Sequence, residues 1–164
     1  ECSTQQMPFI SEKIPTFEEF ANASIEEIYG EEIVDAYERK VTSFESIILI
    51  NKGENKFEIE KLPPLAQSIP ILTSETYDIN EDGYEDVIVG GNIYNTEVET
   101  PRLDNQFALL LISDKNKNYN AIGPDKSGLY LSGNTKSLKI IDRKNPKLLV
   151  ANNNSNLEVF ELNK

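Results

Sequence analysis

The residues best suited to chemistry in this chain are oxygen-bearing side chains that recur at alternate positions between 78 and 86. Asp78, Asn80 and Asp82 occupy the first, third and fifth positions of this segment, and Gly83 and Asp86 occupy the sixth and ninth. A hard divalent cation takes six to eight oxygen ligands at about 2.3–2.6 Å. A short loop supplies them when alternate side chains turn inward and a glycine permits a sharp bend. The spacing therefore predicts a Ca²⁺ site.

We expect five ligand residues in this loop. Asp78, Asn80, Asp82 and Asp86 would bind through their side chains, and Tyr84 through its backbone carbonyl. Without an ion, the carboxylates in this set would repel one another at close range, so metal binding and loop order should be coupled. The alternative is a solvated turn that binds nothing, because Asp, Asn and Gly dominate turns for reasons unrelated to metals.

The residues after the loop indicate which kind of calcium loop this would be. An EF-hand needs a bidentate Glu at position 12 and a helix on each side, but position 12 here is Val89, within the apolar run 87–89. The missing acid at position 12 also argues against a dockerin-type loop. The run 87–89 is followed by Gly90 and Gly91 and is typical of a short buried strand. We therefore expect the loop to join strand to strand.

Three stretches together resemble a known family. The loop, of the form D-x-N-x-D-G-x-x-D, continues into a hydrophobic strand and then Gly90-Gly91-Asn92. This resembles the calcium loop of FG-GAP and VCBS-type repeats. The segment 50–57 is similar to the hairpin that precedes such loops, and 62–67 is similar to the stretch directly after that hairpin. The likeness extends from residue 2 to Asn153 and is greatest to the C-terminal part of bacterial ASPIC/UnbV-type repeat proteins.

The resemblance implies a fold, a location and a class of function. Such repeats build β-propeller blades, so it implies a non-catalytic, calcium-binding scaffold or surface-interaction module of a larger bacterial protein. The implied location is extracellular, at the cell surface or periplasmic. A carbohydrate-binding or carbohydrate-processing part of an extracellular enzyme is the alternative.

Composition excludes several other classes of function. The net charge of −12 argues against a nucleic-acid partner, because phosphate binding requires clustered Lys and Arg. No stretch of the 164 residues is apolar enough to predict a membrane span. The chain contains no histidine, which excludes Ser-His-Asp and Cys-His catalysis and His-ligated metal sites within it. Carboxylate-only catalysis stays possible, but no pair of acids is singled out for it.

The first 43 residues predict a helical segment. Thr16 with Glu19, and Ser24 with Glu27, have the spacing of capping boxes, in which each side chain bonds the backbone N–H of the other residue. Gly30 is a predicted helix end, and a third helical piece is expected over residues 31–40.

From residue 44 onward the hydrophobic pattern changes to that of strands, and we expect a mostly β fold. We predict about two antiparallel, four-stranded, β-propeller-type blades behind the helical segment. The first repeat, 44–92, carries the calcium loop, and the second, 107–164, is degenerate. The predicted strands are 44–50, 56–62, 69–79, 85–89, 107–112, 119–122, 137–141, 146–150 and 157–162.

In the second repeat, Asp142 corresponds to Asp78, but Lys144 replaces the Asn and the later acids are missing, so we assign it no metal. Two blades leave open sheet edges, which predicts contact with neighbouring repeats of the parent protein or self-association. The polar stretch 94–106, with Arg102 and Asp104, and the segment 127–130 are the places where a glycan or protein ligand would be expected.

Overall fold

The computed structural model describes residues 2–104, 108–116 and 118–162. The chain divides into two compact units, Glu1–Ser43 and Phe44–Lys164. The predicted start of the second repeat at 107 and the last residues of the polar stretch 94–106 lie outside the described residues. Within them, no helix is long and apolar enough to cross a membrane.

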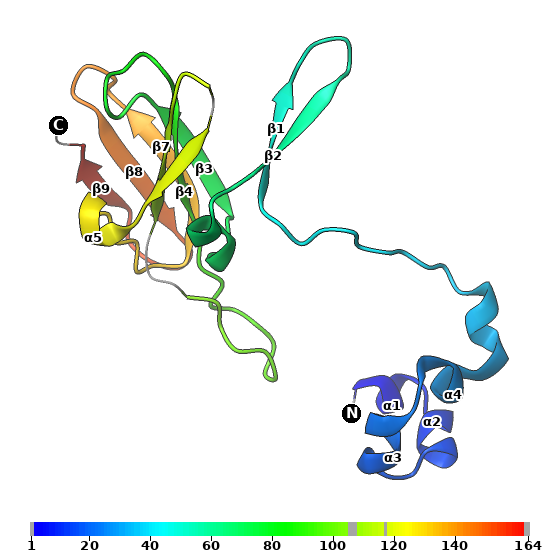
Figure 1. Cartoon of the computed structure of the whole chain (residues 1–164). Coiled ribbons are helices and arrows are strands. Elements are labelled where there is room, and N and C mark those ends of the chain that lie inside the picture. The colour runs from blue at the N-terminus through cyan, green and yellow to red at the C-terminus, as the bar shows by residue number, and fades with distance from the viewer. Residues whose placement is uncertain (1, 105–107, 117, 163–164) are drawn as a thin grey trace. The chain divides into compact units, whose positions relative to one another are not determined.

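The first unit is helical, as predicted, and its helices are all short (Figure 1). Both capping boxes are present: Thr16 and Ser24 each accept a backbone N–H from the glutamate three residues later, and each glutamate bonds back. The third helical piece was predicted to extend to residue 40, which is wrong, because a 3₁₀ helix ends at Asp35. The elements are α1 (Cys2–Gln6), α2 (Phe9–Lys13), α3 (Phe17–Asn22), α4 (Ile25–Tyr29) and η1 (Gly30–Asp35).

The second unit is mostly β, with nine described strands in three antiparallel sheets. The strands are β1 (Ile47–Asn51), β2 (Phe57–Lys61), β3 (Thr73–Tyr77), β4 (Asp86–Gly90), β5 (Leu109–Ser113), β6 (Tyr119–Ile122), β7 (Thr135–Ile141), β8 (Lys147–Asn152) and β9 (Glu158–Glu161). Two short helical turns, η2 (Pro64–Ser68) and α5 (Pro124–Ser127), connect them.

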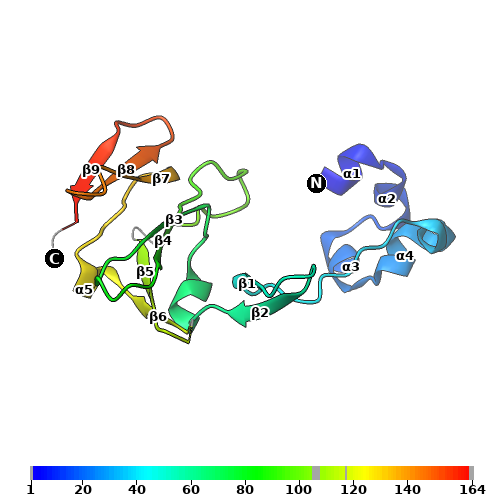
Figure 2. The same cartoon turned by 90° about the horizontal axis from the view of Figure 1, so that it is seen from above.

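The strands are grouped differently from the sequence-based prediction. We expected the first four strands to form one sheet, but β1 and β2 form a sheet of their own, and β3 and β4 join β5 and β6. The third sheet contains β7, β8 and β9 (Figure 2). Pro63 and Pro64 explain the break, since proline supplies no backbone N–H and η2 leads the chain away from β2 before β3 begins.

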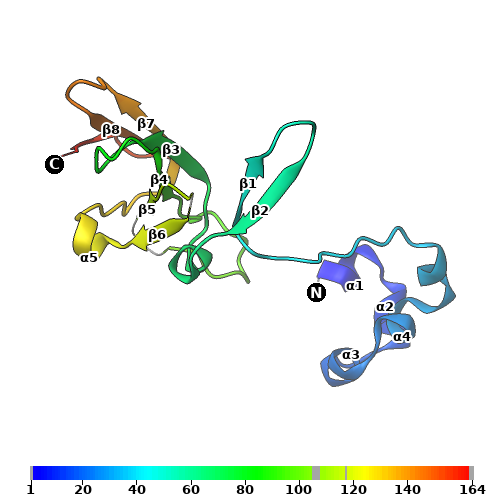
Figure 3. The same cartoon turned by 45° about the horizontal axis from the view of Figure 1, so that its top comes forward.

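The sheet β3-β4-β5-β6 is the central layer of this unit, because alternate residues of its strands enter two different cores. On one face, Ile88 packs with Leu138, Leu148 and other residues of the β7-β8-β9 sheet. On the other face, Val89 and its neighbours pack against the η2 region, with Ile48 of β1 at the margin. Figure 3 shows the β1-β2 hairpin standing apart from the central sheet. The central sheet positions the acidic loop between β3 and β4.

Candidate metal centre

The acidic segment 78–85 connects two adjacent strands of the central sheet. β3 ends at Tyr77 and β4 begins at Asp86, and these two residues are partners across the antiparallel hairpin. The predicted strand-loop-strand arrangement is therefore confirmed. Each end of the loop is fixed by a strand of the sheet.

Three of the predicted ligand side chains lie close together in this loop. The backbone N–H of Asp82 donates to Asp78 Oδ1 and to Asn80 Oδ1, at 3.1 Å in each case. The other carboxylate oxygen of Asp78 accepts the N–H of Gly83 at 2.9 Å. The Asn80 amide nitrogen donates to Asp82 Oδ2 at 3.0 Å. The side chains at the first, third and fifth positions therefore meet around the same stretch of backbone.

The backbone of the loop bends at two residues with positive φ. Gly83 has a φ of 89° and Glu81 a φ of 59°. A side chain at position 83 would meet no atom within 4 Å, so glycine is favoured there by the backbone conformation and not by a lack of space. The N–H of Tyr84 then donates to Asp82 Oδ1 at 2.9 Å. This bend reverses the chain toward β4.

Asp86 is fully buried and is held by backbone groups from two segments. Its Oδ2 accepts the N–H of Ile79 at 2.9 Å, and its Oδ1 accepts the N–H of Ser113 in β5 at 2.8 Å. The Ser113 hydroxyl donates to the backbone carbonyl of Glu85 at 3.0 Å. Asp86 follows the last residue of the loop, and its hydrogen bonds thus join that end to the start of the loop and to β5. Each of its oxygens retains a second lone pair that an ion could share.

The predicted ligands fit a hard cation in part. Asp78 and Asp82 supply carboxylates beside the Asn80 amide, and oxygen is the donor that Ca²⁺ prefers. In contrast, both carboxylate oxygens of Asp86 already accept backbone N–H groups, one from Ile79 and one from Ser113 of β5. Across the described ranges, no three side chains of the types His, Cys, Asp and Glu are gathered as a metal site.

The electrostatic surroundings of the loop are strongly acidic, with five acidic residues between 78 and 86. One basic residue approaches from the third sheet: Arg143 lies 4.0 Å from the Glu85 carboxylate, and both side chains are exposed. On the inner side, burial raises the pKa of the Tyr119 hydroxyl, and the negative charge of Asp86 raises it further.

Two other turns of this unit have similar local geometry without the acids. In the β5–β6 turn, Asp114 Oδ1 accepts the N–H groups of Asn116 and Asn118, and the side chain of Asn118 bonds the other oxygen. The hydrogen bonds from Asn118 hold the pKa of Asp114 below its usual range. In the β7–β8 turn, Asp142 Oδ1 accepts the N–H of Lys144 at 3.2 Å. An Asx turn alone therefore does not indicate a metal site, and the segment 78–86 differs from these two turns in its five acids.

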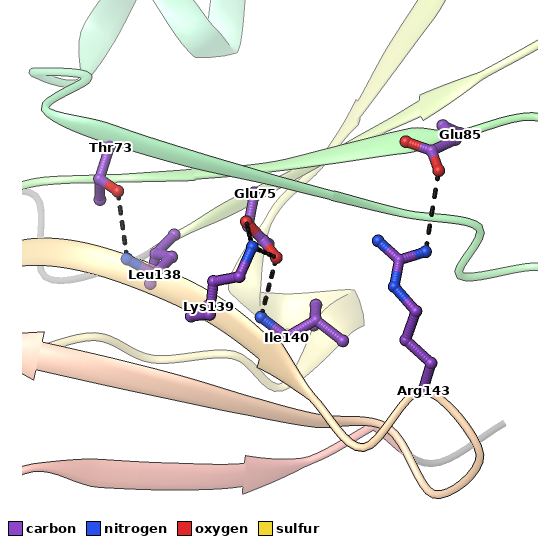
Figure 4. A network of polar contacts seen from close by, with 7 residues as sticks. All are labelled: Thr73, Glu75, Glu85, Leu138, Lys139, Ile140 and Arg143. Carbon is purple, nitrogen blue, oxygen red and sulfur yellow. Dashed lines mark hydrogen bonds and ion pairs between the residues drawn. The ribbon is translucent and has the colours of Figure 1, made fainter.

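Sequence reasoning missed a polar network beside the loop that joins the central sheet to the third sheet (Figure 4). Glu75 Oε1 on β3 accepts the backbone N–H of Ile140 at 3.0 Å and the Lys139 ammonium at 2.8 Å. Thr73 Oγ1 accepts the N–H of Leu138 at 3.1 Å. Burial raises the pKa of Glu75, but the bonds from Lys139 and Ile140 lower it below its ordinary value. The alternation of Thr73 and Glu75 was the only available indication in the sequence.

In the polar stretch 94–104, Arg102 contacts both Tyr94 and Asp104. The Arg102 guanidinium lies 5.0 Å from the centre of the Tyr94 ring, and its Nε pairs with the Asp104 carboxylate. A cleft of about 530 Å³ is lined by Arg102, Leu103, Asp104 and residues 67–70. In the other predicted segment, 127–130, Leu129 is buried and Tyr130 is exposed.

Comparison of the chain with protein-family models, curated proteins and solved structures finds no match. The resemblance to FG-GAP and VCBS-type repeats therefore stays a prediction.

Proposed function

We propose that the chain is a non-catalytic, calcium-binding repeat module that serves as a scaffold or surface-interaction domain of a larger extracellular bacterial protein. The observation that supports it most is the meeting of the Asp78, Asn80 and Asp82 side chains around one bend. Those residues, together with the Tyr84 carbonyl and Asp86, would hold the ion. Calcium would supply charge neutralisation for a loop that carries five acids.

The role of the ion in this proposal is structural. The loop lies between two strands of the central sheet, and Asp86 at its end bonds β5 as well. Neutralising the repulsion within the loop would therefore stabilise the pairing of β3 with β4 and the contact with β5. Since the chain has no histidine, the proposal assigns it no acid-base catalysis of the Ser-His or Cys-His type.

Calcium-titration calorimetry, together with thermal unfolding in chelator and in millimolar calcium, tests the proposal. We expect a dissociation constant on the order of 10⁻⁴ to 10⁻³ M, as in extracellular modules, and weak competition by Mg²⁺, which demands a smaller octahedral site. The melting temperature should rise with calcium by mass action. Equal melting temperatures in the two solutions and no heat of binding would rule out the calcium site.

Asp82→Ala tests whether the Asp82 carboxylate contributes to calcium binding. It should abolish the calcium-dependent rise in melting temperature, because it removes a carboxylate that Asn80 and Tyr84 hold in place. Asp142→Ala is the matched control, since it removes a comparable Asx turn that lacks the neighbouring acids. That control should keep the full response to calcium.

The proposed architecture is that of stacked, propeller-type sheets whose ends are open. The β1-β2 hairpin supports this, because one of its faces is apolar and exposed. Leu49 and Ile59 are direct partners on that face and are 57% and 62% exposed, with Ile47 and Phe57 beside them. We propose that a neighbouring repeat of the parent protein, or a second copy of the chain, covers this end of the unit. Light scattering on the purified chain distinguishes a monomer from a self-associated form.

The second candidate function is carbohydrate binding or processing. The cleft beside Arg102 and Asp104 favours it, since a paired guanidinium and carboxylate offer both donors and acceptors to sugar hydroxyls. A glycan array with and without calcium, and an assay for released sugar, separate the two candidates. Binding that Arg102→Ala abolishes would favour the carbohydrate function, and no binding in either solution leaves the scaffold.

A further inference from the structure

The helical unit formed by residues 1–43 has a small core for its length. Of its described residues, Ile10 and Ile28 are the buried apolar ones. Its helices span five or six residues each, and isolated helices shorter than about 12 residues are marginal in water. Units of this size usually need a metal, a disulfide or a partner to be stable. The unit has one cysteine, so it contains no internal disulfide.

The same unit exposes large apolar side chains. Phe17, Val34 and Tyr37 are each 81% exposed, and Ile25 is 54% exposed. Phe17 lies one helical turn before Phe20 on α3, and the two line a cleft of about 180 Å³ together with Ile14. Of these groups, Phe17 adjoins an apolar cleft, and an exposed apolar patch of this kind marks an interaction surface.

The unit also carries a strong negative charge. Residues 1–43 contain ten acidic and three basic residues, a net charge of −7, against −5 for the 121 residues after them. The acids of the unit that are described are exposed, and the described ion pairs all lie within 44–164. A groove of about 740 Å³ is lined by Glu18, Glu19 and Glu27, by Lys13 and Asn22, and by the apolar side chains of Ile14 and Ala23. Three carboxylates and one ammonium thus border the groove beside two apolar side chains.

We propose that residues 1–43 are a docking element for a protein partner with a basic, amphipathic surface, such as a helix with Lys on one face and Leu on the other. Lys and Arg of the partner would pair with the acids around the groove, and its apolar side chains would pack on Phe17, Phe20 and Ile14. A second copy of this unit is a poor occupant, because two charges of −7 repel. An anionic membrane surface is repelled for the same reason. This inference goes beyond the calcium module and does not depend on it.

Binding should also order the unit. Since its core is small, packing of a partner on the exposed apolar groups would stabilise the short helices, and helix content should rise on binding. The affinity should fall as salt rises, because the attraction is partly between exposed charges.

The experiment uses the full chain and an 18-residue synthetic helix of Lys and Leu with one apolar face. A second peptide of the same composition in scrambled order reports attraction by charge alone. We expect the ordered peptide to bind at least tenfold more tightly than the scrambled one in fluorescence anisotropy, with a gain of helical circular dichroism beyond that of the free components. Equal binding of the two peptides would overturn the proposal.

Two variants test the surface itself. Phe17→Ser should weaken binding of the ordered peptide at least tenfold, because it removes an exposed apolar side chain of the cleft without touching Ile10 or Ile28. Val98→Ser is the matched control, since Val98 is a fully exposed apolar residue outside this unit. Peptide affinity that is unchanged in Phe17→Ser would overturn the proposal. So would binding of the chain to zwitterionic phosphatidylcholine vesicles in place of the peptide, since that would make lipid the occupant.

Discussion

Glu75 on β3 accepts the backbone N–H of Ile140 on β7, and this 3.0 Å hydrogen bond joins two sheets whose described strands share no backbone pairing with each other. Thr73 does the same for Leu138 two residues away. Because β7 is an edge strand of its sheet, these N–H groups would lack partners where the sheets meet. The side chains of β3 satisfy them, so the packing of the two sheets depends on two partly buried polar residues beside the apolar core.

Replacing Glu75 by Leu should lower the free energy of unfolding by about 1–3 kcal/mol, because it leaves the N–H of Ile140 without its acceptor. Glu75→Gln should cost less, since an amide oxygen can still accept that bond while the pairing with Lys139 is lost. Urea denaturation of the full chain measures both. Glu161→Gln is the control: its ion pair with Lys147 is exposed and lies outside the acidic loop, so stability should not change measurably. Equal stabilities of the Leu and Gln variants would contradict this account.

The pH dependence of stability should follow from the same residue. The pKa of Glu75 is lower in the folded chain than its ordinary value, so the folded state favours the charged form. The stabilisation is therefore fully present above the unfolded pKa, which is about 4.3 for Glu, and is lost as the pH falls through the folded pKa. Urea midpoints between pH 7 and pH 3 should fall less steeply in Glu75→Gln than in the parent chain. Parallel pH profiles would contradict the assignment.

Much of the β unit was predictable because its strands have strong local patterns. The strand 119–122 was predicted with its observed bounds, and the acidic loop was expected to join two strands. The bounds 69–79 predicted for the strand before this loop are wrong, since β3 spans Thr73–Tyr77. The pairing of strands was not predictable from these patterns. Leu109–Leu111 pairs with Val87–Val89, and both runs are apolar throughout, so either could have paired with several other strands.

In the candidate site, too, contacts between residues close in sequence were predictable and contacts between distant residues were not. The turn geometry of Asp78, Asn80 and Asp82 follows from residue types a few positions apart, which the sequence displays directly. The environment of Asp86 does not, because its partner Ser113 lies 27 residues further along the chain. The spacing predicts Asp86 as a metal ligand. In the fold, Asp86 is a buried side chain that accepts two backbone N–H groups.

Asp86→Asn tests the anchoring role independently of calcium. The amide presents N–H groups to one of the two backbone donors, so either Ile79 or Ser113 loses its acceptor in a buried place. In chelator, we expect a loss of about 1–3 kcal/mol in the free energy of unfolding. Asp114→Asn, at an exposed turn with a similar bonding pattern, should have little effect. An Asp86→Asn variant as stable as the parent in chelator would show that these two bonds contribute little.

The apolar face of the β1-β2 hairpin yields the last prediction. A two-stranded hairpin is marginally stable in water by itself, and on this one the partners Leu49 and Ile59 face solvent. If a further sheet covers this face in the parent protein, the isolated chain should use it for self-association. Leu49→Thr with Ile59→Thr keeps strand-forming residues while removing much of the apolar surface.

The double variant should therefore shift the chain toward monomer at high protein concentration, and the melting temperature should change little because neither side chain is in a core. Sedimentation velocity at several concentrations measures the shift. Val98→Thr is the control, since Val98 is exposed in a loop and outside the hairpin face, and it should leave the association unchanged. If the unsubstituted chain is monomeric at all concentrations, the exposed face does not mediate self-association and the prediction is wrong.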